Sequence, residues 1–343
     1  MKFGIFDHLD RRDGPLGAFY DDRLEMAAAY ESAGFYCYHI AEHHASPLGM
    51  APSPNVFLAA VARRTTRLRF GPLVYLLPMY HPVRLAEEIC MLDHLSGGRL
   101  DVGVGRGISP HEVGYYGVAP DDRQEMFEEA LDLLMKSLTG QRLRHDGKRY
   151  QIPDSPIELR PLQSPHPPMW YGVGNEHGAE FAARRGMNMV TLGSNERVKE
   201  LVARFHELWD QTLDDPMRAS SPIETPLAGV GRHLFVADTD AEAERLARPA
   251  YAHWYDSVTK LWREHGDAPV TGMLIESYDE ARRIGVAVCG SPATVRAEIA
   301  AQIEDIGFNY LVCQIAWGTL SHAQEMQSLS LFQSEVMGIL ASA

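Results

Sequence analysis

Short runs of apolar residues alternate along the chain with longer segments in which apolar residues recur every three or four positions. The apolar runs are nearly continuous and rich in β-branched and aromatic residues, which is typical of strands buried on both faces of a parallel sheet. The spaced segments, such as DDRLEMAAAYESAG, are typical of helices with one apolar face. The pattern predicts strands at residues 2–6, 35–41, 68–77, 99–105, 168–174, 187–193, 229–237 and 309–317.

This alternation predicts an α/β fold. Eight such units that close on themselves form a (β/α)8 TIM barrel, in which helices surround a cylinder of parallel strands. An open doubly wound sheet would alternate in the same way, but the even number of strands and the absence of a break in composition favour the barrel. Because a barrel often reaches this length, we expect residues 1–343 to form a single domain.

Two segments interrupt the alternation and are predicted to be insertions into the barrel. RLRHDGKRYQIPD, at 142–154, is expected to form a hairpin that turns at Asp146-Gly147, a pair that favours tight turns. Residues 265–291 separate a long helix, at 240–264, from a helix that begins at Ser291-Pro292 with a serine cap and a proline in its first turn. Insertions of this size are either substrate loops or surface decoration.

Composition and charge narrow the class of protein. The net charge of −14 is spread along the chain and argues against nucleic acid and anionic membranes as partners. The four cysteines are isolated in sequence, which favours a reducing compartment over a disulfide framework. The N-terminus lacks the apolar stretch of a signal peptide, and no run of about 18 apolar residues suggests a membrane span. We therefore expect a cytoplasmic protein.

A group of ionisable side chains follows the second predicted strand. The stretch YCYHIAEHHASPLGM places Glu42, His43 and His44 directly after it. With His39, the group also matches the H-x-x-E-H pattern of one class of zinc peptidase, but that chemistry needs both histidines on a helix, and the preceding residues favour a strand. The plainest alternative is a hydrogen-bonded pair of loop histidines. The position of these residues at the end of a strand favours a catalytic role, because barrel enzymes carry their active sites at the C-terminal ends of strands.

A first glycine-rich motif, GRLDVGVGRG at 98–107, is a candidate for cofactor binding. Its alternating glycines would let the backbone approach a flat ligand or a phosphate, and Arg106 at the strand's end would bind that phosphate. The same glycines are also common in tightly packed barrels.

A second glycine-rich motif, MWYGVGNEHGAEFAARRG at 169–186, predicts a strand, a turn and a helix capped by Asn175. The free N–H groups at such a helix start bind anions, although a simply capped barrel helix is the alternative. The glycine spacing is similar to a relaxed dinucleotide fingerprint, but no acidic residue ends the next strand, which argues against a dinucleotide-binding domain.

Taken together, these segments resemble the bacterial luciferase-like flavin monooxygenase family. The resemblance is carried by Ala41-Glu42-His43-His44, by RTTRLRFGPLVYLLPMYHPVRLAEEICMLDHLSGGRLDVGVGRG at 64–107, and by the unit at 169–186. The middle run is the most specific, because LLPxxHPVRxAExxxxLDxLSxGRxxxGxxRG is rarely met outside that family. The resemblance covers most of residues 1–195 and fades beyond them, apart from GSPATV at 290–295 and the final strand.

The resemblance implies a barrel that holds reduced FMN at its C-terminal mouth and uses O2, through a C4a-hydroperoxyflavin, to oxygenate a small organic substrate. His43 matches the family's catalytic histidine, a general acid or base that Glu42 would orient, with His44 beside it. Arg106 matches the arginine that binds the FMN phosphate, and Leu73 is expected beside the cofactor, near a non-proline cis peptide bond common in relatives. The other expected cofactor-binding residues are Gly174, Asn175, Glu176, His177 and Gly178.

The resemblance also implies partners. A separate flavin reductase would supply reduced FMN, and apolar stripes on helices 54–64 and 84–95 would form a homodimer face, although core packing explains these stripes equally well. Luciferase proper has a reactive cysteine where this chain has Gly105, which argues against light emission. No metal is implied. His8, Tyr115, Tyr116 and Trp317 follow predicted strands and are candidates for the substrate pocket, with packing as the alternative.

Two other functions stay open. One is hydride transfer with the deazaflavin F420 on the same barrel, and the other is a non-catalytic flavin-binding protein. The intact Glu42-His43-His44 group and Arg106 favour the monooxygenase over both.

Overall fold

The computed structural model describes residues 1–269 and 274–342, and the main sheet of this part is an almost closed parallel barrel. Its strands are β1 (Lys2–Asp7), β2 (Cys37–Ile40), β3 (Arg69–Pro72), β4 (Tyr75–Leu76), β5 (Val102–Gly105), β8 (Met169–Val173), β9 (Asn188–Thr191), β10 (Ala228–Val236), β11 (Ala287–Gly290) and β12 (Tyr310–Gln314).

The order of hydrogen-bonded neighbours is β3-β2-β1-β12-β10-β9-β8-β5-β4, with β11 added beside β10. A further parallel bridge, between Phe70 of β3 and Leu100 just before β5, links the two sides of the remaining gap. This arrangement confirms the predicted (β/α)8 barrel.

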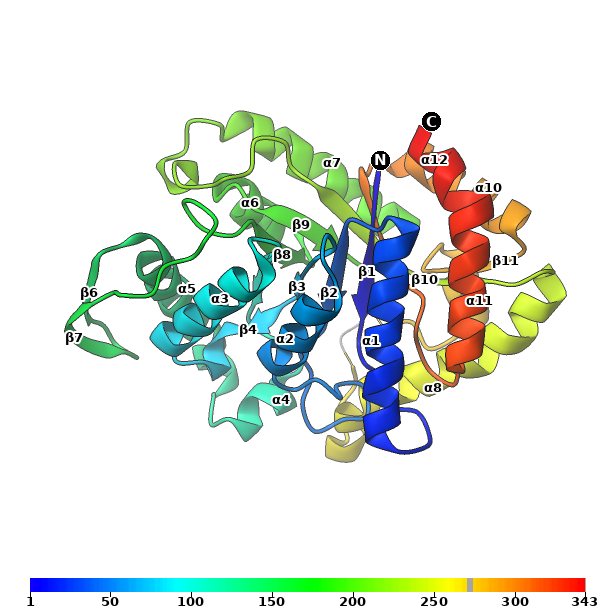
Figure 1. Cartoon of the computed structure of the whole chain (residues 1–343), viewed down its shortest axis with the longest axis horizontal. Coiled ribbons are helices and arrows are strands. Elements are labelled where there is room, and N and C mark those ends of the chain that lie inside the picture. Colours follow the sequence, from blue (N-terminus) through cyan, green and yellow to red (C-terminus); the bar gives the residue numbers. More distant parts are fainter. Residues whose placement is uncertain (270–273, 343) are drawn as a thin grey trace.

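Helices cover the outer face of the sheet, and in Figure 1 α1 and α11 lie side by side over β1, with the two chain ends near each other. No helix in the described ranges combines the length and the apolar character needed to cross a membrane. The helices are α1 (Leu16–Ala33), α2 (Pro54–Arg64), α3 (Pro82–Ser96), α4 (Pro110–Tyr115), α5 (Arg123–Thr139), α6 (Glu176–Arg184), α7 (Asn195–Gln211), α8 (Asp240–His265), α9 (Tyr278–Arg283), α10 (Pro292–Ile306), α11 (His322–Phe332) and α12 (Gly338–Ser342).

Every predicted strand contains observed strand residues, but the predicted strand at 68–77 is two short strands, β3 and β4, with a cis peptide bond between Leu73 and Val74. The cis bond lies where the resemblance placed it. The Leu73–Val74 bond lies at the C-terminal end of the barrel strands. The segment between β3 and β4 therefore faces the region where ligands bind in barrel folds.

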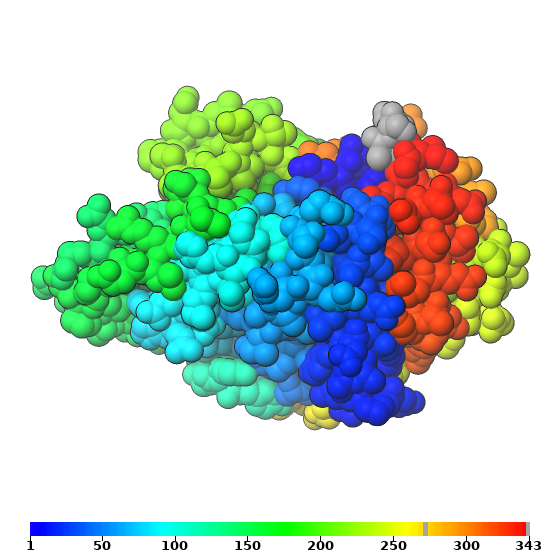
Figure 2. All heavy atoms as spheres, viewed as in Figure 1, coloured from blue at the N-terminus to red at the C-terminus, as the bar shows by residue number. Residues whose placement is uncertain are grey.

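The first predicted insertion is the antiparallel hairpin β6 (Arg142–Asp146) and β7 (Gln151–Pro156). Its turn is longer than the predicted tight turn, because Gly147 N–H donates to the carbonyl of Tyr150 at 3.1 Å and closes a loop over 147–150. Figure 2 shows this part of the chain projecting beyond the barrel helices.

The second predicted insertion, at 265–291, contains α9 and β11, while its residues 270–273 lie outside the described part of the chain. The helix that follows begins as predicted, with Ser291 accepting a hydrogen bond from the Thr294 N–H and Pro292 in the first turn.

Polar and aromatic side chains close the lower part of the barrel interior. His39 bonds to the hydroxyl of Tyr310 at 2.9 Å, and Trp170 Nε1 donates to Asp101 at 2.7 Å. Apolar side chains fill the rest of the interior, and the cavity lies at the C-terminal ends of the strands. The interior cluster consists of Phe6, Ala41, Leu73, Trp170, Val190, Leu227, Tyr310 and Val312.

Candidate active site

A cavity of about 480 Å³ lies at the C-terminal ends of the barrel strands. This volume falls within the roughly 300–1,000 Å³ typical of small-molecule sites. Of the residues predicted to form the site, seven line the cavity and three, His44, Glu176 and His177, do not. The seven are Glu42, His43, Leu73, Arg106, Gly174, Asn175 and Gly178.

His43 is held by a carboxylate that sequence reasoning missed. Its Nδ1 lies 2.9 Å from Oε1 of Glu112, and the same oxygen accepts the backbone N–H of His44 at 3.1 Å. Because an ionised carboxylate only accepts hydrogen bonds, Nδ1 of His43 donates and Nε2 is left for other partners. The carboxylate thus fixes both the orientation of the ring and the position of its second nitrogen.

Glu112 lies on α4, the short helix that follows β5 and Arg106 in the chain. The Ser109-x-x-Glu112 spacing is that of a capping box, and Ser109 does accept the Glu112 N–H at 3.4 Å. The Glu112 carboxylate, however, is bonded to the ring of His43, 69 residues earlier in the chain, and to the backbone of His44, 68 residues earlier. The Ser109-x-x-Glu112 spacing indicates a helix start from the sequence alone. Only the fold shows that the Glu112 carboxylate binds His43.

His43 and Glu112 form a hydrogen-bonded imidazole–carboxylate pair in the wall of the cavity. Burial alone would lower the pKa of His43, but the charge and hydrogen bond of Glu112 outweigh it and raise that pKa above its ordinary value. Burial likewise acts to raise the pKa of Glu112, yet the charge of His43 and the hydrogen bonds from His43 and His44 lower it. The pair therefore favours the protonated form of His43 and the ionised form of Glu112.

Glu42 does not orient His43, contrary to expectation. Its Oε1 bonds to Nε2 of His44 at 3.0 Å, and its Oε2 accepts the Leu76 N–H at 3.0 Å. The Tyr116 hydroxyl then bonds to Nδ1 of His44 at 2.8 Å. Burial raises the pKa of Glu42 in spite of these bonds. The chain Glu42–His44–Tyr116 fixes the segment after β2 against the segment around β4.

The zinc-peptidase geometry is absent from this group. His39 lies in the barrel interior and bonds to Tyr310, His43 bonds to Glu112, and Glu42 bonds to His44. The three side chains therefore do not converge on one point, because they follow a strand and its extension rather than a helix.

Across the cavity, three arginines converge from different elements: Arg106 after β5, Arg123 at the start of α5, and Arg197 in the first turn of α7. Within residues 1–269 and 274–342 none of them forms an ion pair; their hydrogen bonds go to Gln124 Oε1, to the carbonyls of residues 107 and 120, and to the carbonyl of residue 174. Burial, and next the charge of Arg106, lower the pKa of Arg123. An uncompensated positive charge of this kind binds anions.

The start of α6 adds to this positive region. Asn175 caps the helix as predicted, with its Oδ1 accepting the Gly178 N–H at 2.9 Å. That N–H is thereby occupied, and Glu176 and His177, whose side chains are exposed, do not line the cavity. The start of α6 therefore reaches the cavity through Gly174, Asn175 and Gly178, and its helix dipole favours an anion at this end of the cavity.

The alternating glycines after Arg99 serve packing. A Cβ on Gly103 would lie 2.3 Å from the carbonyl oxygen of Pro72, and one on Gly105 would lie 2.4 Å from a methyl group of Val74. These glycines therefore make room for the segment that contains the cis peptide, and Gly105 also lines the cavity itself. The packing interpretation of this motif is confirmed at both positions.

Of the four other pocket candidates, only His8 lines the cavity. Tyr116 bonds to His44, Tyr115 is exposed and bonds to His265 at 3.1 Å, and Trp317 is buried and donates to the carbonyl of Leu234 at 3.3 Å. Each of these three has a structural role instead.

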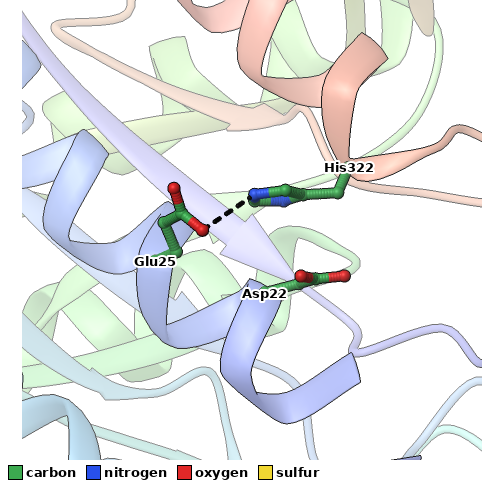
Figure 3. Close-up of side chains that lie close together, drawn as sticks. All are labelled: Asp22, Glu25 and His322. Carbon is green, nitrogen blue, oxygen red and sulfur yellow. Dashed lines mark hydrogen bonds and ion pairs between the residues drawn. The ribbon is translucent and has the colours of Figure 1, made fainter. Parts of the chain in front are cut away.

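The one group in the described part of the chain with metal-ligand spacing is Asp22, Glu25 and His322, between α1 and α11. Figure 3 shows His322 bonded to Glu25, at 3.2 Å, and Asp22 is ion-paired with Arg12. None of the three lines the cavity. They are interhelical ion pairs on the outer layer of the barrel.

The fold and the site together define an α/β-barrel protein whose mouth holds a histidine–carboxylate pair and three arginines without an ion-pair partner in the part of the chain that the structure describes. A family model described as luciferase-like monooxygenase matches residues 1–310. The chain belongs to the luciferase-like monooxygenase family, as the sequence motifs indicated.

The similar proteins support this assignment. The chain is 39% identical over 337 residues to the uncharacterized protein y4wF of Sinorhizobium fredii, covering 98% of this chain and 96% of that protein. It is 30% identical over 256 residues to the oxygenase component of the flavin-dependent trigonelline monooxygenase of Acinetobacter baylyi, covering 72% and 68%.

A solved structure of similar fold is the oxygenating constituent of 3,6-diketocamphane monooxygenase from Pseudomonas putida, a type II Baeyer-Villiger monooxygenase in complex with FMN. It matches with a TM-score of 0.81 at 24% identity, covering 98% of each chain, and this likeness shows the fold. The trigonelline relative is named as a flavin-dependent monooxygenase component and the 3,6-diketocamphane relative as a monooxygenase in complex with FMN.

Proposed function

We propose that this chain is the oxygenase component of a flavin monooxygenase that uses reduced FMN, delivered by a separate reductase, and O2 to oxygenate a small organic substrate. The observation that carries the proposal is the division of one cavity between His43, bonded to Glu112, on one side and arginines without an ion-pair partner among the residues that the structure describes on the other. The oxygenase-component name of the trigonelline relative supports a separate reductase.

The residues present fit FMN. Arg106, Arg123 and Arg197 would hold its phosphate near the start of α6, because these three guanidinium groups have no carboxylate partner in the described residues. The flat ring would lie along the Leu73–Val74 segment. When bound and reduced, FMN supplies the electrons that activate O2.

The chain's own contribution is to position a proton and to exclude water. Glu112 raises the pKa of His43 and occupies its Nδ1, which leaves Nε2 for the reacting atoms, so that His43 acts as the proton donor in the reaction. The apolar residues Phe6, Val190 and Leu192 line the same cavity. They keep the reacting atoms away from bulk water, which strengthens the electrostatic effect of His43.

The test is an anaerobic titration of the protein with photoreduced FMN and, separately, with reduced F420, followed by mixing with O2 in the presence and absence of candidate substrates. We expect saturable binding of reduced FMN, much weaker binding of F420, and oxygenated product by mass spectrometry when the substrate is present. Binding of F420 alone would support hydride transfer instead. Tight FMN binding without product from a broad substrate panel would support a flavin-binding role.

A further inference from the structure

The side of the cavity opposite the arginines carries a row of polar side chains, which we name the polar arc: His43, His8, Gln314 and His233. They belong to β2, β1, β12 and β10 or directly follow them, and these strands are consecutive neighbours in the sheet. His233 and Gln314 are paired in register across β10 and β12. All four line the cavity, so the arc spans about half of the barrel mouth.

The strand alternation explains why these side chains point inward. On β12, Tyr310 and Val312 fill the barrel interior, and Gln314 is the next residue on that face. On β10, Arg232 bonds to Gln302 of an outer helix, so its neighbour His233 faces the interior. The arc is thus the uppermost layer of the barrel interior, directly above the apolar layers.

The arc has unmet hydrogen-bonding capacity. Within the ranges that the structure describes, both ring nitrogens of His233 and Oε1 of Gln314 are buried without a partner, and the two side chains are 2% and 3% exposed. Trp254, whose ring contacts His233 at 4.1 Å between centroids, also has an unpaired Nε1 and also lines the cavity. Buried polar groups are nearly always paired, so such a cluster on a cavity wall indicates a missing partner.

His8, His233 and Gln314 of the polar arc carry no charge at neutral pH, and this determines which kind of ligand group suits them. Burial lowers the pKa of His233 to about 3, and burial, followed by the charges of His43 and His233, keeps the pKa of His8 well below its ordinary value. Both rings are neutral at pH 7, and Gln314 is uncharged. Neutral donors and acceptors beside His43 suit an uncharged polar group, whereas the cavity's anion site is on the opposite strands β5 and β8.

We propose that His233 and Gln314, with His8, recognise an uncharged oxygen of the substrate, a carbonyl or a hydroxyl, and hold it beside His43. The rest of this substrate is apolar, because Phe6, Val190, Leu192 and Val258 line the same cavity. The substrate class is therefore an apolar ring or chain that carries an uncharged oxygen, and free carboxylates and amines are excluded. This inference rests on the proposed function and adds its substrate class.

The experiment compares three probes of similar size: cyclohexanone, methylenecyclohexane, which lacks the oxygen, and cyclohexanecarboxylate, which is charged. Binding is measured by ligand-observed NMR on the full chain, with and without FMN. We expect cyclohexanone to bind about tenfold more tightly than either other probe, as one or two neutral hydrogen bonds allow. Equal binding of cyclohexanone and methylenecyclohexane, preference for the carboxylate, or no binding of cyclohexanone overturns the proposal.

The variants Gln314→Met and His233→Phe test the residues. Both keep the side-chain size, and phenylalanine suits the aromatic surroundings of position 233. Each is expected to remove most of the ketone preference while the dissociation constant of FMN stays within about twofold of wild type. If His233→Phe fails to fold, the ketone preference of Gln314→Met alone tests the proposal. Val258→Ala, the matched apolar control, should weaken all probes alike.

FMN binding separates this proposal from the proposed function. If the variants lose FMN binding, the arc belongs to the flavin site and the proposal is wrong. If the wild-type chain prefers the ketone but does not bind FMN, the recognition site stands and the proposed function fails.

Discussion

His43 is the side chain that connects the cavity to proton chemistry. Its Nδ1 is occupied by Glu112, and its ring stacks on His8 with 5.6 Å between the centroids. The ring therefore has a fixed orientation, and its remaining nitrogen faces the region where we place the substrate oxygen.

His43→Ala is expected to lower kcat/KM by about 10²–10⁴-fold, the usual contribution of a general acid. The affinity for reduced FMN should stay near the wild-type value, because the phosphate site is on the other side of the cavity. Steady-state oxygen uptake with substrate measures the first quantity, and an anaerobic titration measures the second. His94→Ala, at an exposed position on α3, is the control and should retain full activity; an unchanged rate in His43→Ala would exclude the proton-donor role.

Glu112→Gln is expected to move the alkaline limb of the pH–rate profile to lower pH. In the wild type the carboxylate raises the pKa of His43, so the imidazolium persists above the ordinary value of about 6.5. Without that charge, burial lowers the pKa, and the proton donor is lost at lower pH. The measurement is kcat/KM against pH, with the exposed Glu304→Gln as control.

The same pair contributes to folding stability with a definite sign. Because the folded-state pKa of His43 is raised, its stabilisation is complete below about pH 6.5 and is lost as the pH rises through the raised pKa. The difference in unfolding free energy between wild type and Glu112→Gln should therefore shrink at alkaline pH. A difference that stays constant over this interval would contradict the ion pair.

At the scale of elements, the anion site is assembled from the starts of two helices and the end of one strand. Arg123 opens α5, Arg197 lies in the first turn of α7, and Arg106 follows β5. In a barrel, helix starts and strand ends meet at the same face, so residues distant in sequence converge there.

Arg123→Ala and Arg197→Ala are each expected to weaken FMN binding by about 10–100-fold, the range of a charge-assisted hydrogen bond. Riboflavin, which lacks the phosphate, should bind these variants and the wild type alike. Flavin fluorescence titration measures both ligands. Arg204→Ala on α7 is the matched control, since Arg204 pairs with Glu207 and does not line the cavity. A parallel loss of riboflavin affinity would indicate a general structural defect.

At the scale of the whole molecule, one outer face is unusually apolar. Val56 of α2 is 74% exposed, and Met91 and Leu95 of α3 are 55% and 46% exposed. The two helices lie side by side on the barrel surface (Figure 1). Large exposed apolar side chains gathered on one face mark an interaction surface, and a self-complementary face gives a two-fold dimer.

We therefore predict a homodimer through the α2–α3 face. The double variant Met91→Glu with Leu95→Glu should be monomeric by light scattering coupled to size-exclusion chromatography, because two carboxylates would be buried at the interface. Leu213→Glu, at an equally exposed position outside this face, should leave the dimer intact. A wild-type monomer at micromolar concentration would rule out the dimer.

The net charge of the chain gives no hint of the cavity's character. The sequence carries −14 overall, yet the arginines at the barrel mouth form a local positive site. The sum of charges is a property of composition, whereas the site depends on which few side chains the fold brings together.

Local patterns in the sequence determined the eight predicted strands, most helices, the α6 cap at Asn175 and the location of the His43 group and Arg106, but they missed β11, which lies within the segment predicted as an insertion. A buried parallel strand requires a continuous apolar run, and a helix start requires particular cap residues. Both features can therefore be recognised from neighbouring residues in the sequence. Family motifs then placed the cis peptide bond near Leu73.

Only the tertiary structure decided which side chains meet. Glu112 rather than Glu42 holds His43, Arg123 and Arg197 join Arg106, and His233 pairs in register with Gln314. These partners lie 17 to 91 residues apart in the sequence, and nothing in the local pattern records that they meet. The physical reason is barrel closure: it brings the C-terminal ends of all strands to one mouth, and a one-residue change of register would turn each of these side chains outward.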